Sequence, residues 1–138
     1  MTSAGVTLAG DAVETFNNLK LGRKSQFILY KIDSDTHSIV VDSTYPPGAS
    51  HDDFLNSLDD KQCRYVVLDF PYEDEGANRN KIIFGVWAPD TAPIEQKKLY
   101  ASSKDTLRKA LVGIQAEVQG TDRTEITHQA MLERVQKI

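Results

Sequence analysis

The sequence predicts an α/β fold in which helices cover both faces of a central sheet of mixed strands. Four short segments rich in β-branched and aromatic residues form two neighbouring pairs, each joined by a polar connection as in a β-hairpin. Segments with apolar residues at helical spacing precede, separate and follow these pairs. The later pair is apolar almost without interruption, which is typical of strands buried on both faces.

Size and composition predict one domain over residues 1–138. The chain is 40% hydrophobic, enough for a single core. The small, uncharged residues of 1–10 predict a flexible N-terminal arm. No run of about 18 apolar residues occurs, and the N-terminus has no basic region followed by an apolar run, so we expect a soluble protein that is not exported. The single Cys63 excludes an intramolecular disulfide and is expected to be a small buried residue.

The first half of the chain predicts a helix, a hairpin and a second, short helix. Asp11 is a suitable N-cap for a helix that ends near Leu21, with Gly22 as its stop. Residues 27–32 and 38–43 predict antiparallel strands around a polar turn. The short helix starts at Ser50 or His51 and runs to about residue 58.

The second half predicts another hairpin, a long helix, a short strand and a terminal helix. Residues 64–72 and 81–87 predict strands, with 73–80 (EDEGANRN) as the turn between them. The long helix is expected from residue 94 towards 113, with a bend near the two serines at 102 and 103. Residues 116–119 predict the short strand, and the last helix begins at Thr124 or Thr127.

The long helix is predicted to bury one stripe of mostly apolar side chains and to expose a neighbouring stripe of cationic side chains to solvent. At 3.6 residues per turn, Lys104 and Arg108 fall within about 20° of Lys97 around the helix axis. The spacing of the neighbouring stripe predicts burial of Tyr100, Leu107, Leu111 and Ile114. The chain as a whole holds 20 acidic and 16 basic side chains, so this basic stripe is local. It suits an acidic protein or an anionic lipid better than duplex DNA, and the alternative is a solvated helix face.

No pattern in the sequence indicates catalysis, a metal or a cofactor. His37, His51 and His128 have no companions at metal-ligand spacing, and each is expected at the surface. The glycine-rich phosphate loop, the dinucleotide fingerprint and the GxSxG nucleophile turn do not occur in the sequence. We therefore expect a binding protein, not an enzyme, with no cofactor and no nucleic-acid partner.

Several motifs resemble the actin-depolymerising factor/cofilin family. They occur in family order across nearly the whole chain: LKLG at 19–22, CRYVVLDF at 63–70, WAPD at 87–90, YASSKDTLRK at 100–109 and GIQAEVQGTD at 113–122. The resemblance implies one actin-depolymerising-factor homology domain with a mixed sheet of about five strands. It also implies a monomeric protein of the actin cytoskeleton that binds monomeric and filamentous actin, prefers ADP-actin, and severs and depolymerises filaments.

The resemblance implies two actin-binding sites. The first, for monomer and filament, comprises Ser3, Gly5, Val6, Lys97, Lys104, Asp105, Arg108 and Lys109. Exposed apolar residues near Leu99 would anchor its centre. The second, for filaments, comprises Arg79, Lys81, Glu133, Arg134 and Lys137. Phosphatidylinositol bisphosphate is expected to compete as an inhibitor for Lys97, Lys104, Arg108 and Lys109.

The sequence departs from the family pattern at three places. Ala4 stands where relatives commonly have a regulatory serine, so Ser3 is the candidate phosphorylation site. Glu95 and Lys98 replace residues that are usually basic and Met, respectively. Two rival functions stay open: a non-severing filament-side or branching-complex regulator of the same fold, and a phosphoinositide-binding module.

Overall fold

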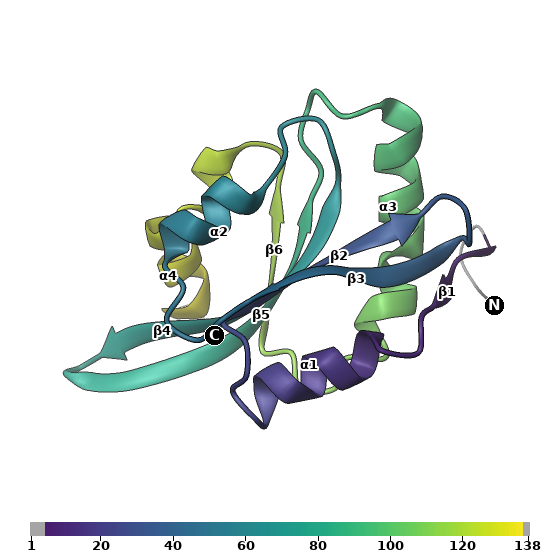
Figure 1. Ribbon diagram of the computed structural model, residues 1–138. Coiled ribbons are helices and arrows are strands. Elements are labelled where there is room, and N and C mark those ends of the chain that lie inside the picture. The colour runs from purple at the N-terminus through teal and green to yellow at the C-terminus, as the bar shows by residue number, and fades with distance from the viewer. Residues whose placement is uncertain (1–4, 137–138) are drawn as a thin grey trace.

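The computed structural model describes residues 5–136, and within them six strands form one mixed sheet (Figure 1). The strand order is β1-β3-β2-β4-β5-β6. Four of the five strand pairs join strands predicted from the sequence, while β1 (Thr7–Leu8) adds a sixth strand parallel to β3. The predicted fold class is confirmed.

The first helix and the first hairpin lie where the sequence predicts them. Helix α1 spans Ala12–Lys20. Strands β2 (Phe27–Asp33) and β3 (Ser38–Tyr45) pair antiparallel. Helix α2 (His51–Ser57) starts with a capping box, in which the Ser50 hydroxyl accepts from the Asp53 N–H and the Asp53 carboxylate accepts from the Ser50 N–H.

The second hairpin is longer than predicted. Strands β4 (Arg64–Asp74) and β5 (Ala77–Trp87) pair along their whole length, so most of the expected turn 73–80 is strand. Only Glu75 and Gly76 turn the chain, with φ of 51° and 82°, a region in which glycine is free of strain. The tip of the hairpin projects beyond the helices as an arm (Figure 1).

The long helix connects β5 to the parallel strand β6 (Ala116–Gly120). Helix α3 spans Ile94–Arg108 and is continuous through the two serines, but it ends five residues before the predicted limit of 113. A tight turn, in which the Ala110 N–H donates to the Leu107 carbonyl, closes its C-terminus. A 3-10 turn (Arg123–Ile126) and helix α4 (His128–Gln136) complete the described chain.

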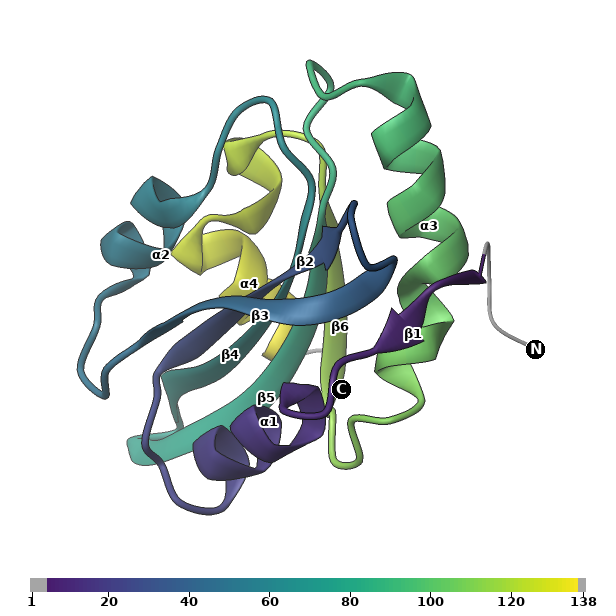
Figure 2. The same ribbon diagram turned by 45° about the vertical axis from the view of Figure 1, so that its right-hand side comes forward.

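Helices cover both faces of the sheet, as the apolar strands predicted. On one face α1 and α3 bury Phe16, Leu19, Tyr100 and Leu107 in one cluster with the sheet. On the other face α2 and α4 bury Phe54, Met131 and Val135 in a second cluster (Figures 1 and 2). No helix among residues 5–136 has the length and apolarity that crossing a membrane requires.

The expectation of a flexible arm over 1–10 is wrong for the part that the structure describes. Val6 is fully buried in the cluster under α1 and α3. The Thr7 N–H donates to the His37 carbonyl and the Ala9 N–H to the Ile39 carbonyl, both at 3.0 Å. An apolar anchor and an open strand edge on β3 therefore order this segment. Residues 1–4 lie outside the described part of the chain.

Candidate protein-binding surface

Helix α3 is fixed to the sheet through its buried face. The Tyr100 hydroxyl accepts a hydrogen bond from the Ile32 N–H at 2.9 Å, and the Tyr65 hydroxyl donates to the Tyr100 carbonyl at 2.5 Å. The Gln96 side chain accepts from the Cys63 N–H at 2.6 Å. Burial raises the pKa of both tyrosine hydroxyls, so they stay protonated. These contacts hold the helix in one orientation.

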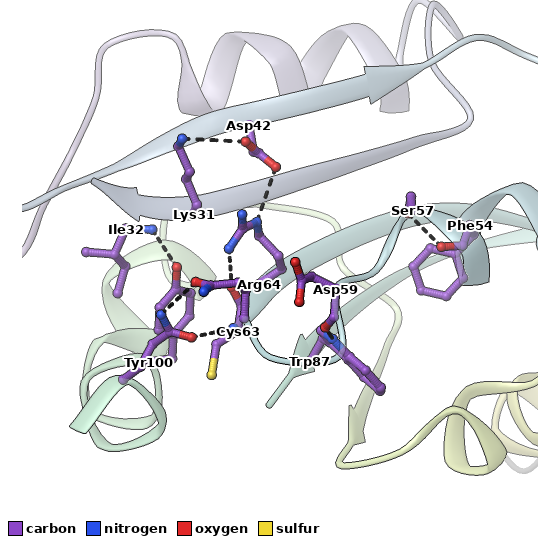
Figure 3. A network of polar contacts seen from close by, with 12 residues as sticks. Lys31, Ile32, Asp42, Phe54, Ser57, Asp59, Cys63, Arg64, Trp87 and Tyr100 are labelled. Carbon is purple, nitrogen blue, oxygen red and sulfur yellow. Dashed lines mark hydrogen bonds and ion pairs between the residues drawn. The ribbon is translucent and has the colours of Figure 1, made fainter. Parts of the chain in front are cut away.

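A polar network beside the buried face of α3 fixes the beginning of β4 (Figure 3). The Asp42 carboxylate pairs with Arg64 at 3.2 Å and with Lys31 at 3.6 Å, and Arg64 donates to the Cys63 carbonyl at 2.7 Å. Cys63 itself is fully buried, as predicted. Burial raises the pKa of its thiol to about 11, which keeps it in the unreactive protonated form.

The predicted cationic stripe exists, but its members already have partners inside the protein. Lys97 donates to the Asp90 carbonyl at 3.2 Å. Lys104 Nζ and Arg108 Nε both reach the Glu117 carboxylate, at 2.9 and 3.0 Å. All three cations are half-buried where α3 faces the edge of the sheet. The pair Lys104–Arg108 therefore carries a net charge of one, because Glu117 neutralises the other.

Sequence reasoning missed Glu117, since β6 and α3 meet only in the folded chain. Hydrogen bonding from Lys104, followed by that from Arg108, holds the pKa of the Glu117 carboxyl below its ordinary value and outweighs the opposing effect of burial. The carboxylate is therefore charged throughout the neutral range.

The two remaining predicted residues of this region, Asp105 on α3 and Lys109 directly after its last residue, are both exposed. The expectation of exposed apolar contacts near Leu99 is wrong, because Leu99 packs against the core cluster under the helix. The large exposed apolar side chain on this helix is Ile94 in its first turn, at 62% exposure. Lys98, 3.9 Å from Glu95, is exposed as well.

A groove of about 530 Å³ lies between α3 and the neighbouring edge of the sheet. Ile94, Lys97, Ala101 and Lys104 line it from the helix, and Val86 and Gln119 are among the residues that line it from the strands. Apolar and cationic side chains therefore meet in one concave strip beside the helix. Such a strip suits a partner that offers an apolar side chain next to acidic groups.

The described part of the N-terminal segment lies beside α3, which brings it to the same surface (Figure 2). Gly5 is exposed and adopts a φ of 75°, a conformation that favours glycine. Val6 is buried, so its side chain cannot touch a partner and instead anchors the segment. Ser3 lies outside the described residues.

The second predicted set is divided between the hairpin and α4. Arg79 and Lys81 are two residues apart on β5 and face the side of the sheet that α4 covers, since their strand partners Tyr72 and Phe70 belong to that cluster. Arg79 pairs with Asp74 at 3.4 Å. Arg79 lies in a strand, and not in the turn that the sequence predicted, whereas Lys81 lies in a strand as predicted.

On α4, both predicted residues Glu133 and Arg134 are exposed. Arg134 Nε donates to the backbone carbonyl of Glu117 at 2.7 Å, so this residue is held against the edge strand β6. Lys137, the remaining member of the predicted set, lies outside the described residues.

Of the three histidines, His51 contradicts the prediction of a surface position. It is half-buried, its Nε2 lies 2.8 Å from the Ile126 carbonyl, and its ring meets that of His128 with centroids 5.5 Å apart. Both rings line a cavity of about 200 Å³ with Phe54 and Phe70. His37 and His128 are exposed, as predicted.

These features define a protein-binding domain of the α/β class. The residues predicted to contact a partner lie on one long helix, on the segment beside it, and on the hairpin and terminal helix. Within residues 5–136, no group of three or more His, Cys, Asp and Glu side chains is arranged to hold a metal ion.

Comparison with known proteins identifies the family. Residues 5–136 match the family described as cofilin/tropomyosin-type actin-binding protein, and the chain belongs to this family. Cofilin-1A of Dictyostelium discoideum is 52% identical over 136 residues, which cover 99% of both chains. Actophorin of Acanthamoeba castellanii is 42% identical over 134 residues, 97% of both. The crystal structure of Streptomyces griseoflavus cofilin superposes with a TM-score of 0.90 at 42% identity, covering 96% of this chain and 98% of that one.

Proposed function

We propose that this protein binds monomeric and filamentous actin and promotes filament turnover by severing and depolymerisation. The observation that carries the proposal is the α3 surface, on which Asp105 and Lys109 are exposed and Lys104 and Arg108 are held in defined positions. Membership of an actin-binding family and 52% identity to a named cofilin supply the partner. The protein acts through binding free energy and performs no chemistry of its own.

The monomer-binding site consists of the exposed residues of α3, with the segment around Gly5 beside them and Ser3 as its candidate phosphorylation site. Lys97, Lys104, Arg108 and Lys109 face acidic groups on actin, and Asp105 pairs with a basic one. The side chain of Val6 supports this surface from below, because it is buried. Ile94 replaces the region near Leu99 as the apolar contact, since it is exposed at the rim of the groove.

The filament-binding site adds Arg79 and Lys81 of the hairpin to Glu133, Arg134 and Lys137 of the C-terminal region, and contacts a neighbouring subunit. The projecting hairpin supports this proposal (Figure 1), because Arg79 lies on β5 only three residues after the turn residue Gly76. By binding an altered subunit arrangement, and ADP-actin, more tightly than the alternatives, the protein shifts the filament towards that state. Boundaries between decorated and bare segments then break.

The same cations on α3 bind phosphatidylinositol bisphosphate, which competes with actin and inhibits the protein. The protein works as a monomer in the cytoplasm, at the actin cytoskeleton. Two rivals make different predictions. A non-severing filament-side or branching-complex regulator would bind filaments without shortening them, and a phosphoinositide module would bind vesicles without binding actin.

The decisive experiment combines co-sedimentation with actin filaments and measurement of filament length by microscopy. The test variant is Arg108→Ala/Lys109→Ala. The matched control is Lys24→Ala/Lys61→Ala, which also removes two positive charges but from exposed positions that are not on α3 and belong to neither predicted site. We expect the wild type and the control to bind and shorten filaments, and the test variant to do neither.

The outcomes separate the rival functions. Binding without shortening would support the filament-side regulator. Vesicle binding without any binding of monomeric or filamentous actin would support the phosphoinositide module. Equal actin binding by the test variant and the wild type would refute the assignment of the site to α3.

A further inference from the structure

Glu117 contacts both predicted binding surfaces through different atoms. Its carboxylate reaches Lys104 and Arg108 on α3, and its carbonyl accepts the hydrogen bond from Arg134 on α4. These contacts come from elements that cover opposite faces of the sheet. None of the residues predicted from the sequence occupies such a junction.

The position of Glu117 on the sheet explains this double contact. β6 is an edge strand paired parallel to β5, and the Gly120 carbonyl accepts from the Ala88 N–H. Peptide groups of successive residues in a strand point to opposite sides, and those of alternate residues point to the same side. Glu117 is three residues before Gly120, so its carbonyl points away from β5, towards the free edge of the sheet. Side chains alternate too: Ala116 and Val118 belong to the α4 side, so the Glu117 carboxylate projects towards α3.

The carboxylate affects binding in two opposing ways. It fixes two long side chains that would otherwise lose rotamer freedom on binding a partner, which favours a partner of matching shape. It also cancels one of two positive charges, which weakens attraction to any anionic surface. Lys104 and Arg108 are 37% and 32% exposed, so both remain accessible to a partner while paired.

We propose that Glu117 is a specificity-determining residue, which favours actin over unstructured anionic surfaces by positioning Lys104 and Arg108 while neutralising half of their charge. This inference rests on the proposed actin-binding function. It combines ordering for the correct partner with a penalty for wrong ones, which is a general route to specificity. The residue does not itself contact actin.

Two substitutions separate charge from position. Glu117→Gln keeps the shape of the side chain and removes its charge, whereas Glu117→Asp keeps the charge and shortens the reach. Glu14→Gln is the control for net charge, because Glu14 is an exposed residue of α1. Helix α1 covers the same face of the sheet as α3, but its residues belong to neither predicted site. Thermal melting checks that each variant is folded.

The readouts are affinity for actin monomers and binding to vesicles of phosphatidylserine and phosphatidylcholine. For Glu117→Gln we expect monomer affinity to fall about fivefold, from lost ordering of two side chains. Vesicle binding should rise about fivefold and depend more steeply on salt, as expected for one added unit of positive charge. Glu117→Asp should bind vesicles like the wild type and bind actin with intermediate affinity, and Glu14→Gln should match the wild type in actin binding.

The results distinguish failure of this inference from failure of the proposed function. A wild-type protein that does not bind actin would overturn the proposed function. A wild type that binds actin, with a Glu117→Gln variant that binds actin at least as tightly, would overturn the inference alone. Unchanged vesicle binding by Glu117→Gln would also overturn it, because the neutralised charge would then have no effect.

Discussion

The hydrogen bond between Tyr100 and Ile32 is predicted to be a main support of α3. β2 pairs with β4 only as far as Tyr30–Tyr65, so the Ile32 N–H lies beyond the last pair. The Tyr100 hydroxyl supplies its acceptor at 2.9 Å. Tyr100→Phe removes that acceptor and leaves the ring in place, so the amide of Ile32 is left without a partner in a half-buried position.

The cost follows from the unsatisfied donor. Leaving a buried amide unpaired costs about 1–3 kcal/mol, and half-burial favours the lower part of that range, about 1–2 kcal/mol. An unfolding entropy of about 2.1 cal/mol/K per residue over this length converts the loss to a fall in Tm of about 3–7 °C. Thermal unfolding followed by circular dichroism measures the fall, and hydrogen exchange should show faster exchange of the Ile32 amide.

The control is Tyr72→Phe, because no hydrogen bond from the Tyr72 hydroxyl is found among residues 5–136. It should melt within about 1–2 °C of the wild type, as a substitution away from specific contacts does. A Tyr100→Phe protein with the stability of the wild type and unchanged exchange at Ile32 would refute the reasoning. The support of α3 would then come from apolar packing alone.

Three further predictions concern the sheet, the histidine cavity and the hairpin. Gly85→Ala should lower the free energy of unfolding by about 1–3 kcal/mol, because the added Cβ would lie 2.8 Å from methyl groups of Val66 and Val118. Urea titration measures this change, and unchanged stability would show that the strands move apart freely. Burial lowers the pKa of His51, so the unfolded state binds protons first as the pH falls below about 6.5. The free energy of unfolding should therefore decrease on acidification, by at most about 1.4 kcal/mol per pH unit from this group. His51→Gln should reduce this pH dependence in thermal melts across pH 5–8. The same dependence of stability on pH in the variant and the wild type would exclude the role of His51. Arg79→Ala should weaken co-sedimentation with actin filaments and leave the affinity for actin monomers unchanged. If filament binding and monomer binding fell equally, the hairpin would not belong to a filament-specific site.

Local chemistry was sufficient to predict most of the elements. The spacing of apolar residues in α1 and the capping residues of α2 involve residues only a few positions apart, so both helices can be predicted from the sequence. The periodicity of α3 likewise identified the buried Tyr100 and Leu107. The length of the hairpin turn was wrongly predicted because residues 77–80 (ANRN) have low strand propensity, yet pairing with β4 holds them extended.

The contacts between distant segments were decided only by the tertiary structure. Nothing near Val6 predicts that β3, which begins at Ser38, offers an open edge, and nothing near His51 predicts the proximity of His128. The cationic stripe was predicted from helix geometry, but its neutralisation depends on β6 bringing Glu117 beneath it. Helical periodicity depends on residues a few positions apart, so it can be predicted from the sequence. The net charge of a surface depends on which strand packs against it, so it is decided by the tertiary structure.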